Sequence, residues 1–114
     1  MDQITKQQQY RPLIEQVLRQ HAQMATEPPG SAALVVCDRA SDNYLLLDVG
    51  WDASGRVHYV LAHLRLQAGQ VLIEKDGIEY GIAQDLQEAG IPAADIITAW
   101  RALPSQQVHA ALAA

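Results

Sequence analysis

The sequence predicts an α+β domain in which helices cover one face of an antiparallel sheet. Near the N-terminus, apolar residues recur at the three- and four-residue spacings of an amphipathic helix. Short apolar runs then follow between residues 32 and 75, separated by short turn-rich segments. Strands joined by such short connections pair as antiparallel neighbours, so we expect a meander of four to five strands. A short C-terminal helix completes the prediction.

The first helix is predicted over residues 3–25. Its apolar stripe comprises Ile4, Tyr10, Leu13, Ile14, Val17 and Leu18. Because Pro12 lacks a backbone donor and suits a first helical turn, we expect the regular helix to begin near Tyr10. Residues 1–9 would then form a loosely ordered polar leader. The segment TEPPGS at 26–31 ends the helix in a loop.

The strands are predicted from runs of apolar and alternating residues. The runs are ALVVCD, YLLLDVGW, RVHYVLAHLRL and VLIEK, and they are connected by RASDN, DASG and QAGQ. Strict alternation in the third run places His63 on the face of Tyr59 and His58 on the opposite face. The dipeptide Asp76-Gly77 is typical of a hairpin, which makes IEY at 78–80 a candidate fifth strand.

The C-terminal part is predicted to be mainly helical. GIAQDLQEAG forms a short helix that ends at Gly90, because glycine followed closely by Pro92 is a common helix stop. PAADII is expected to add one further turn. The alanine-rich tail at 101–114 is expected to be loosely ordered.

Composition indicates one globular domain and disfavours several functions. The chain has 114 residues, of which 49% are hydrophobic and 18% charged. Its net charge is −5, and its eight Lys and Arg residues are scattered singly. Direct DNA binding by the isolated chain is therefore disfavoured, since DNA-binding proteins cluster basic side chains against phosphates. A cytoplasmic protein is expected, because the sequence has no signal-peptide pattern, no apolar run of ~20 residues and an unpaired Cys37.

Catalytic, metal and cofactor motifs are not apparent. The four histidines lack ligand spacing, and Cys37 lies in an apolar run without an activating base. A nuclease-like set of Asp48, Glu74 and Lys75 is rejected, because adjacent residues of a strand face opposite sides of the sheet. We therefore predict a non-enzymatic protein without a metal or cofactor.

The candidate interaction surface lies around the second predicted strand. Its residues are Asp38, Arg39, Asp42, Tyr44, Trp51 and His63. Aromatic residues and arginine often anchor protein interfaces, which makes a protein-contact patch the functional interpretation. Structural interpretations are a charge-capped turn at 38–44, packing of Trp51 against the edge of the core, and a hydrogen-bonded, half-buried His63.

Several motifs in sequence order resemble the XisI family, the fdxN element excision controlling factors. They are Tyr10-Arg11, DRASDNYLLLDVGW, RVH, DGIEYGIAQDL and AGIPAADII, and together they span about residues 10–98. The chain departs from the family pattern at Leu72, at Ile78 and in the tail after Trp100.

The resemblance implies a small α+β protein of cyanobacteria and some other bacteria. It also implies an accessory role in the site-specific excision of the fdxN DNA element during heterocyst differentiation. In that system a separate recombinase cuts the DNA, and the expected partner is an XisH-like protein, the recombinase complex or both. Two alternatives stay open: an antitoxin-like subunit that neutralises a nuclease-like partner, and a small-molecule binding module with His63 or Tyr59 at an open sheet face. An exposed edge strand would also allow a homodimer.

Overall fold

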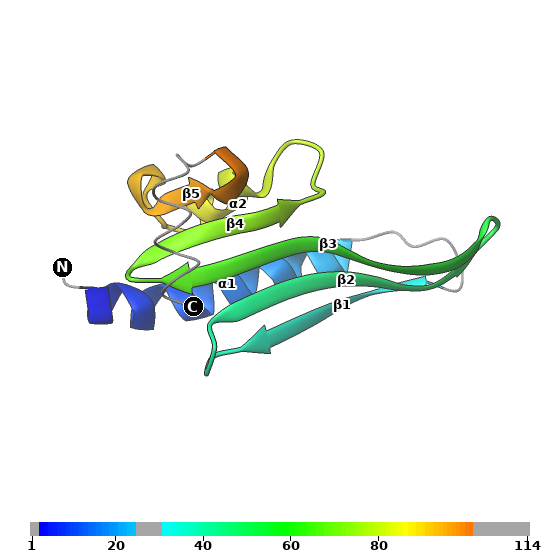
Figure 1. Ribbon diagram of the computed structural model, residues 1–114, viewed down its shortest axis with the longest axis horizontal. Helices are drawn as coiled ribbons and strands as arrows, with labels where there is room; N and C mark the ends of the chain where they lie inside the picture. Colours follow the sequence, from blue (N-terminus) through cyan, green and yellow to red (C-terminus); the bar gives the residue numbers. More distant parts are fainter. Residues whose placement is uncertain (1–2, 25–30, 102–114) are drawn as a thin grey trace.

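The computed structural model describes residues 3–24 and 31–101 (Figure 1). Its elements are α1 (Gln3–Met24), β1 (Ser31–Asp38), β2 (Asn43–Asp52), β3 (Gly55–Gln67), β4 (Gln70–Asp76), α2 (Ile82–Glu88), the 3-10 helix η1 (Ala93–Asp95), β5 (Ile96–Thr98) and the 3-10 helix η2 (Ala99–Arg101). The loop predicted at 26–31 lies outside the described residues apart from Ser31, and so does the tail after Arg101. The predicted α+β class is confirmed.

The sheet has the order β1-β2-β3-β4-β5, and its first four strands form the predicted antiparallel meander. The fifth strand is β5 rather than IEY, and it pairs parallel to β4. Asp76-Gly77 does not form a hairpin, because the Gly77 N–H donates to Leu61 O at 2.7 Å. The chain then leaves the sheet through α2 and returns in the same direction as β4, as a parallel pairing requires.

The helix α1 begins at Gln3 and continues through Pro12, so the predicted loose leader is wrong for residues 3–9. An internal proline costs roughly 3 kcal/mol in an isolated helix. Tertiary contacts offset that cost on the N-terminal side. Lys6 Nζ lies 3.2 Å from Asp95 Oδ2, and Gln7 donates to Asp42 Oδ2 while its Oε1 accepts from the Gly69 N–H at 2.9 Å.

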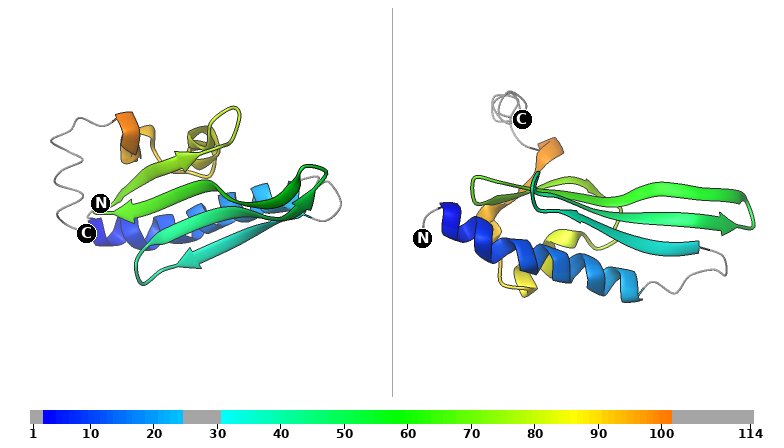
Figure 2. Two further views of the ribbon diagram at one scale, coloured as in Figure 1. Left: turned by 45° about the vertical axis from the view of Figure 1, so that its right-hand side comes forward. Right: turned by 90° about the horizontal axis from the view of Figure 1, so that it is seen from below.

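Both helices, α1 and α2, cover the same face of the sheet (Figure 2). We call this the inner face and the opposite one the outer face. The residues buried between the helices and the inner face are Tyr10, Ile14, Val17, Leu18, Tyr44, Leu46, Ala62, Leu64, Leu66, Val71, Ile73, Ile82, Leu86 and Ile91. The helical stripe predicted from residue 10 onward thus packs on alternate residues of β2, β3 and β4.

Two β-bulges change which side chains share a face. In β3, Leu46 pairs with Ala62 but Leu47 pairs with Val60, so Leu61 is an extra residue. The strict alternation predicted for this strand is therefore wrong. His58 and His63 both face outward, while Tyr59 faces inward and donates to Asp48 Oδ2 at 2.7 Å. The second bulge lies at Glu74 in β4.

The β2–β3 hairpin extends beyond the end of α1 as an arm (Figure 1). It gives the molecule a long axis of 46 Å against 27 Å in the other two directions. At its tip, Asp52 Oδ1 accepts from the N–H and the hydroxyl of Ser54, and Gly55 has a φ of 127°. The predicted DASG turn is confirmed, and its glycine occupies the conformation that L side chains disfavour.

Replacing Gly77 by alanine is expected to lower the free energy of unfolding by about 1–3 kcal/mol. A Cβ at this position would lie 2.8 Å from both Leu61 Cδ1 and Leu61 O, in the bulge of β3. Urea denaturation followed by circular dichroism measures the change. An unaltered midpoint would show that the bulge does not constrain the exit from β4.

Candidate interaction surface

The sequence-predicted site residues separate into two groups at opposite ends of β2. The turn at 38–42 and Tyr44 lie at one end, whereas Trp51 lies at the other, seven residues from Tyr44. That separation is about 23 Å along a strand. The prediction that these residues form one patch is therefore wrong.

Asp42 and Tyr44 belong to an internal polar cluster with α1. Arg11 donates from Nε to Asp42 Oδ1 at 2.9 Å and from Nη2 to Oδ2 at 3.0 Å, while Tyr44 donates to Oδ1 at 2.6 Å. Burial opposes ionisation of Asp42, but the hydrogen bonds from Arg11 and Tyr44 outweigh it and lower its pKa. Burial also raises the pKa of Tyr44. Asp42 is 8% exposed and Tyr44 fully buried, so neither is available to a partner.

Asp38 and Arg39 form a charge-capped turn, as the structural interpretation predicted. Asp38 accepts from the Ala40 N–H at 3.2 Å and from Ser41 Oγ at 2.6 Å. Arg39 donates to both carboxylate oxygens of Glu15 on α1, at 2.8 and 2.6 Å. This bidentate pair lowers the pKa of Glu15. The turn is thereby fixed to the helix.

His63 lies half-buried on the outer face, where its Nε2 is 2.9 Å from Asn43 Oδ1. Burial lowers the pKa of His63, which favours the neutral imidazole near pH 7. The prediction of a hydrogen-bonded, partly buried histidine is confirmed.

Trp51 stands exposed on the arm, with 61% of its surface accessible, so the prediction of packing against the core is wrong. Strand pairing places Trp51 on the outer face with Leu47 and Val49, on the side of the sheet opposite α1, so the helix does not cover the indole. Arg56, its cross-strand partner, places its guanidinium carbon 5.6 Å from the ring centroid and donates to Gly50 O at 2.9 Å. A cation–π pair of this kind holds both side chains in a defined geometry without burying them.

The outer face of the sheet is apolar and is not covered by α1 or α2 (Figure 2). Strand pairing places eight Leu, Val and Ile side chains on it: Leu34, Val36, Leu45, Leu47, Val49, Val60, Leu72 and Ile97. Leu34 and Val36 on β1 are 46% and 44% exposed. Contiguous apolar surface rarely lies open on a monomer without a binding role. This face, with Trp51 and Arg56 at one end, is the candidate interaction surface.

Charge is distributed unequally between the two sides of the molecule. On the outer face, Glu74 is paired with Arg65 at 3.5 Å, Arg56 and Lys75 are further cations, and Asp38 is a further carboxylate. Most described carboxylates instead make their contacts on the inner side: Glu15, Asp42, Asp48, Asp76, Asp85 and Asp95. The candidate surface is thus much less acidic than the chain as a whole.

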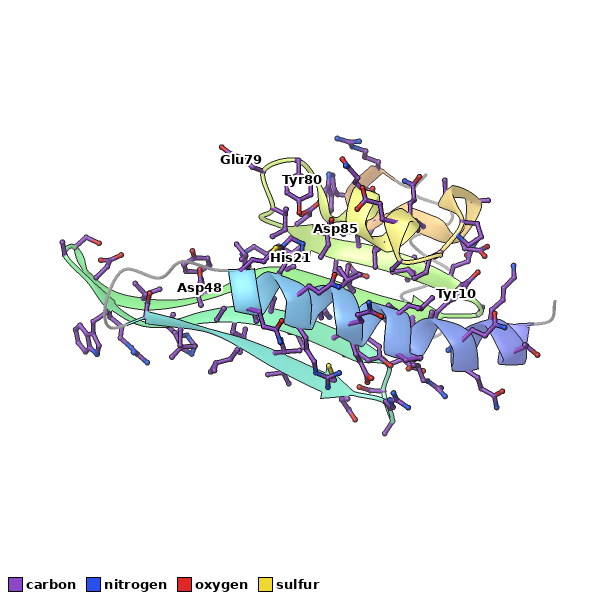
Figure 3. The ribbon with its side chains drawn as sticks, turned by 180° about the vertical axis from the view of Figure 1, so that it is seen from behind. Tyr10, His21, Asp48, Glu79, Tyr80 and Asp85 are labelled. Atoms are coloured by element: carbon purple, nitrogen blue, oxygen red, sulfur yellow. The ribbon has the colours of Figure 1, made fainter. Side chains whose placement is uncertain are left out.

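A cluster that the sequence did not predict joins the C-terminal end of α1 to α2 (Figure 3). His21 Nε2 lies 2.5 Å from Asp85 Oδ2, which also accepts from Tyr80 Oη at 2.7 Å. The hydrogen bond to Asp85 raises the pKa of Tyr80 to about 12. Residues so far apart in sequence give no local signal, because only the packing of α2 beside α1 brings them together.

Other chemistry finds little support in the described part of the chain. Residues 5–24 and 31–101 contain no group of three or more His, Cys, Asp or Glu side chains placed to hold a metal. An open depression beside α2 is lined by Gln87, Gly90, Ile91, Pro92 and Ala93, and neither His63 nor Tyr59 contributes to it. No described helix is long and apolar enough to span a membrane.

Comparisons with known proteins agree on one relationship. A family model described as XisI protein matches residues 1–111. The structure of an XisI-like protein from Anabaena variabilis ATCC 29413 is similar, with a TM-score of 0.78 and 19% identity over 90% of this chain and 94% of that chain. The fdxN element excision controlling factor XisI from the same organism has a TM-score of 0.68 and 30% identity over 93% of this chain and 99% of that chain. No curated protein matches the chain.

Replacing Asp42 by asparagine is expected to reduce stability at pH 7 by about 2 kcal/mol or more, because Arg11 and Tyr44 lose a charged acceptor. The folded-state pKa values of Asp42 and Glu15 lie below their ordinary values. Their stabilising contribution is therefore present above the unfolded pKa of about 4 and is lost as the pH falls through the folded-state pKa values.

Urea denaturation between pH 7 and pH 2 measures both effects. D42N should lose less stability than the wild type as the pH falls, whereas D52N, at the exposed arm tip, should keep nearly the wild-type stability at pH 7. Equal pH dependence in D42N and the wild type would contradict the assigned role of Asp42.

Proposed function

The chain belongs to the XisI family, and we propose that it is a non-catalytic excision controlling factor that acts by binding a protein partner. The family assignment supports the controlling role, since one similar structure is an fdxN element excision controlling factor. In its specific form, the proposal is that the chain controls the site-specific excision of the fdxN element and that its partner is an XisH-like protein.

The exposed Trp51–Arg56 pair is the observation that carries the proposal. Tryptophan and arginine are the residues most enriched among interface hot spots. Here both lie at the end of an arm that no described helix supports. The apolar outer face continues from this pair across the sheet, which provides the uncharged surface that the centre of an interface requires.

The charge distribution favours a protein partner over DNA. The net charge of −5 would repel a phosphate backbone, and the outer-face cations are too few to reverse this. A protein surface with an apolar centre and a carboxylate near Arg56 would complement the arm. Control of excision would then be exerted through the partner, while the partner or a recombinase contacts the DNA.

The polar clusters of the inner side support a non-catalytic role. Asp42, Asp85 and Asp95 each accept a hydrogen bond from a tyrosine hydroxyl and also contact a basic side chain from α1. These bonds join separate segments of the chain, so their loss would lower the stability of the fold. A structural role thus accounts for each cluster without a catalytic one.

Replacing Trp51 by alanine is expected to weaken partner binding by at least about tenfold, equivalent to 1.4 kcal/mol or more, while the melting temperature stays close to wild type. Tagged full-length chain, incubated in native lysate with and without DNase, would capture the partner for identification by mass spectrometry. Titration of the purified partner then gives the affinity. W100A is a matched control, because Trp100 is also exposed but lies on η2.

Two results would contradict the proposal. One is the absence of any stoichiometric partner both with and without DNase. The other is a captured partner that W51A binds as tightly as the wild type. A cellular assay extends the test: amplification across the rejoined junction measures excision in cells that express the wild type, W51A or W100A, and W51A alone should change its frequency.

A further inference from the structure

The strand β1 forms one edge of the sheet, and no described segment pairs with its open side (Figures 1 and 2). Such an edge presents unpaired backbone N–H and C=O groups, which natural proteins usually protect with charge, proline, bulges or short length. The other edge follows this rule, since β5 has three residues. β1 has eight residues, pairs with β2 without a bulge, and contains neither proline nor lysine.

The charge pattern identifies the occupant that this edge fits. Two copies of a chain with a net charge of −5 repel each other over most of their surfaces. From Ser31 to Cys37, however, β1 carries no charged side chain. The β1 edge is therefore a place where two acidic copies can approach without bringing like charges into opposition.

We propose that β1 pairs antiparallel with β1 of a second copy, which makes one continuous sheet across a two-fold symmetric dimer. An isologous contact of this kind requires a strand that is complementary to itself. Symmetry about Val35 places Leu34 opposite Val36, and Ala33 opposite Cys37. Ala32 then faces Asp38, so no two carboxylates oppose each other.

This register also joins the apolar surfaces of the two copies. Directly opposed residues of antiparallel strands lie on the same face of the sheet. Leu34 and Val36, both nearly half exposed, would pack against their counterparts on a shared outer face. Ala33, Val35 and Cys37 would meet on the inner side, where they already pack against the core. The dimer uses the β1 side of the candidate interaction surface, whereas the partner contact proposed above centres on Trp51 and Arg56. Val35, at the dimer axis, pairs with Leu46, five residues from Trp51, so W51A and L34K/V36K test the two proposals separately.

Sedimentation velocity of the full-length chain over a range of concentrations tests the assembly. We expect a reversible dimer whose dissociation constant rises by at least about tenfold in the double variant L34K/V36K. Both side chains are exposed, so the fold of the monomer should persist. M24K is the control, because Met24 is an exposed apolar residue on α1 rather than on the edge.

Cysteine cross-linking tests the geometry independently of affinity. In a C37S background, V35C should form a disulfide-linked dimer on mild oxidation, since each introduced thiol faces its own counterpart. A53C, at the exposed arm tip, should remain monomeric on reducing-agent-free gels. A chain that stays monomeric at all concentrations, or a dimer that L34K/V36K leaves intact, would overturn the proposal.

Discussion

The contacts of α1 with three separate segments are the constraint on which the rest of the structure depends. Arg11 fixes the β1–β2 turn through Asp42, and Glu15 fixes the same turn through Arg39. The helix also contacts segments further along the chain: Tyr10 donates to Asp95, and His21, in the last turn, contacts Asp85. One helix therefore sets the position of the turn, of α2 and of η1, while its apolar stripe fills the core between them.

This arrangement separates the polar chemistry of the molecule from its open surface. Most charged side chains of the inner side form hydrogen bonds or ion pairs within the molecule, and many of these side chains are half-buried. Neither α1 nor α2 covers the outer face, which carries apolar side chains with few charges. Under the proposed function, recognition of a partner would rely on hydrophobic contact and on a small number of arginines. Such a surface supports the proposal that the chain acts by binding another protein.

Local patterns in the sequence predicted the elements better than their mutual placement. The spacing of Ile14, Val17 and Leu18 identified the helix, and Gly55 and Gly90 identified a turn and a helix end. The helical state of residues 3–9 escaped prediction, because it depends on contacts with residues 42, 69 and 95. A bulge leaves no local mark either, so alternation across Leu61 placed His63 on the face of Tyr59, whereas the structure places it on the face of His58. The exposure of Trp51 follows from its place on the outer face, and a strand pattern does not show which face the helices will cover.

The hydrogen bond between Tyr10 and Asp95 joins residues 85 positions apart and has a consequence for biosynthesis. The N-terminal helix cannot complete its contacts until nearly the entire domain has left the ribosome. Before that moment the nascent chain already contains the whole β1–β4 meander, whose connections are local and close quickly. The emerging sheet then has an open edge strand and an apolar face that α1 does not yet cover. In that state it is exposed to chaperones and to neighbouring nascent chains.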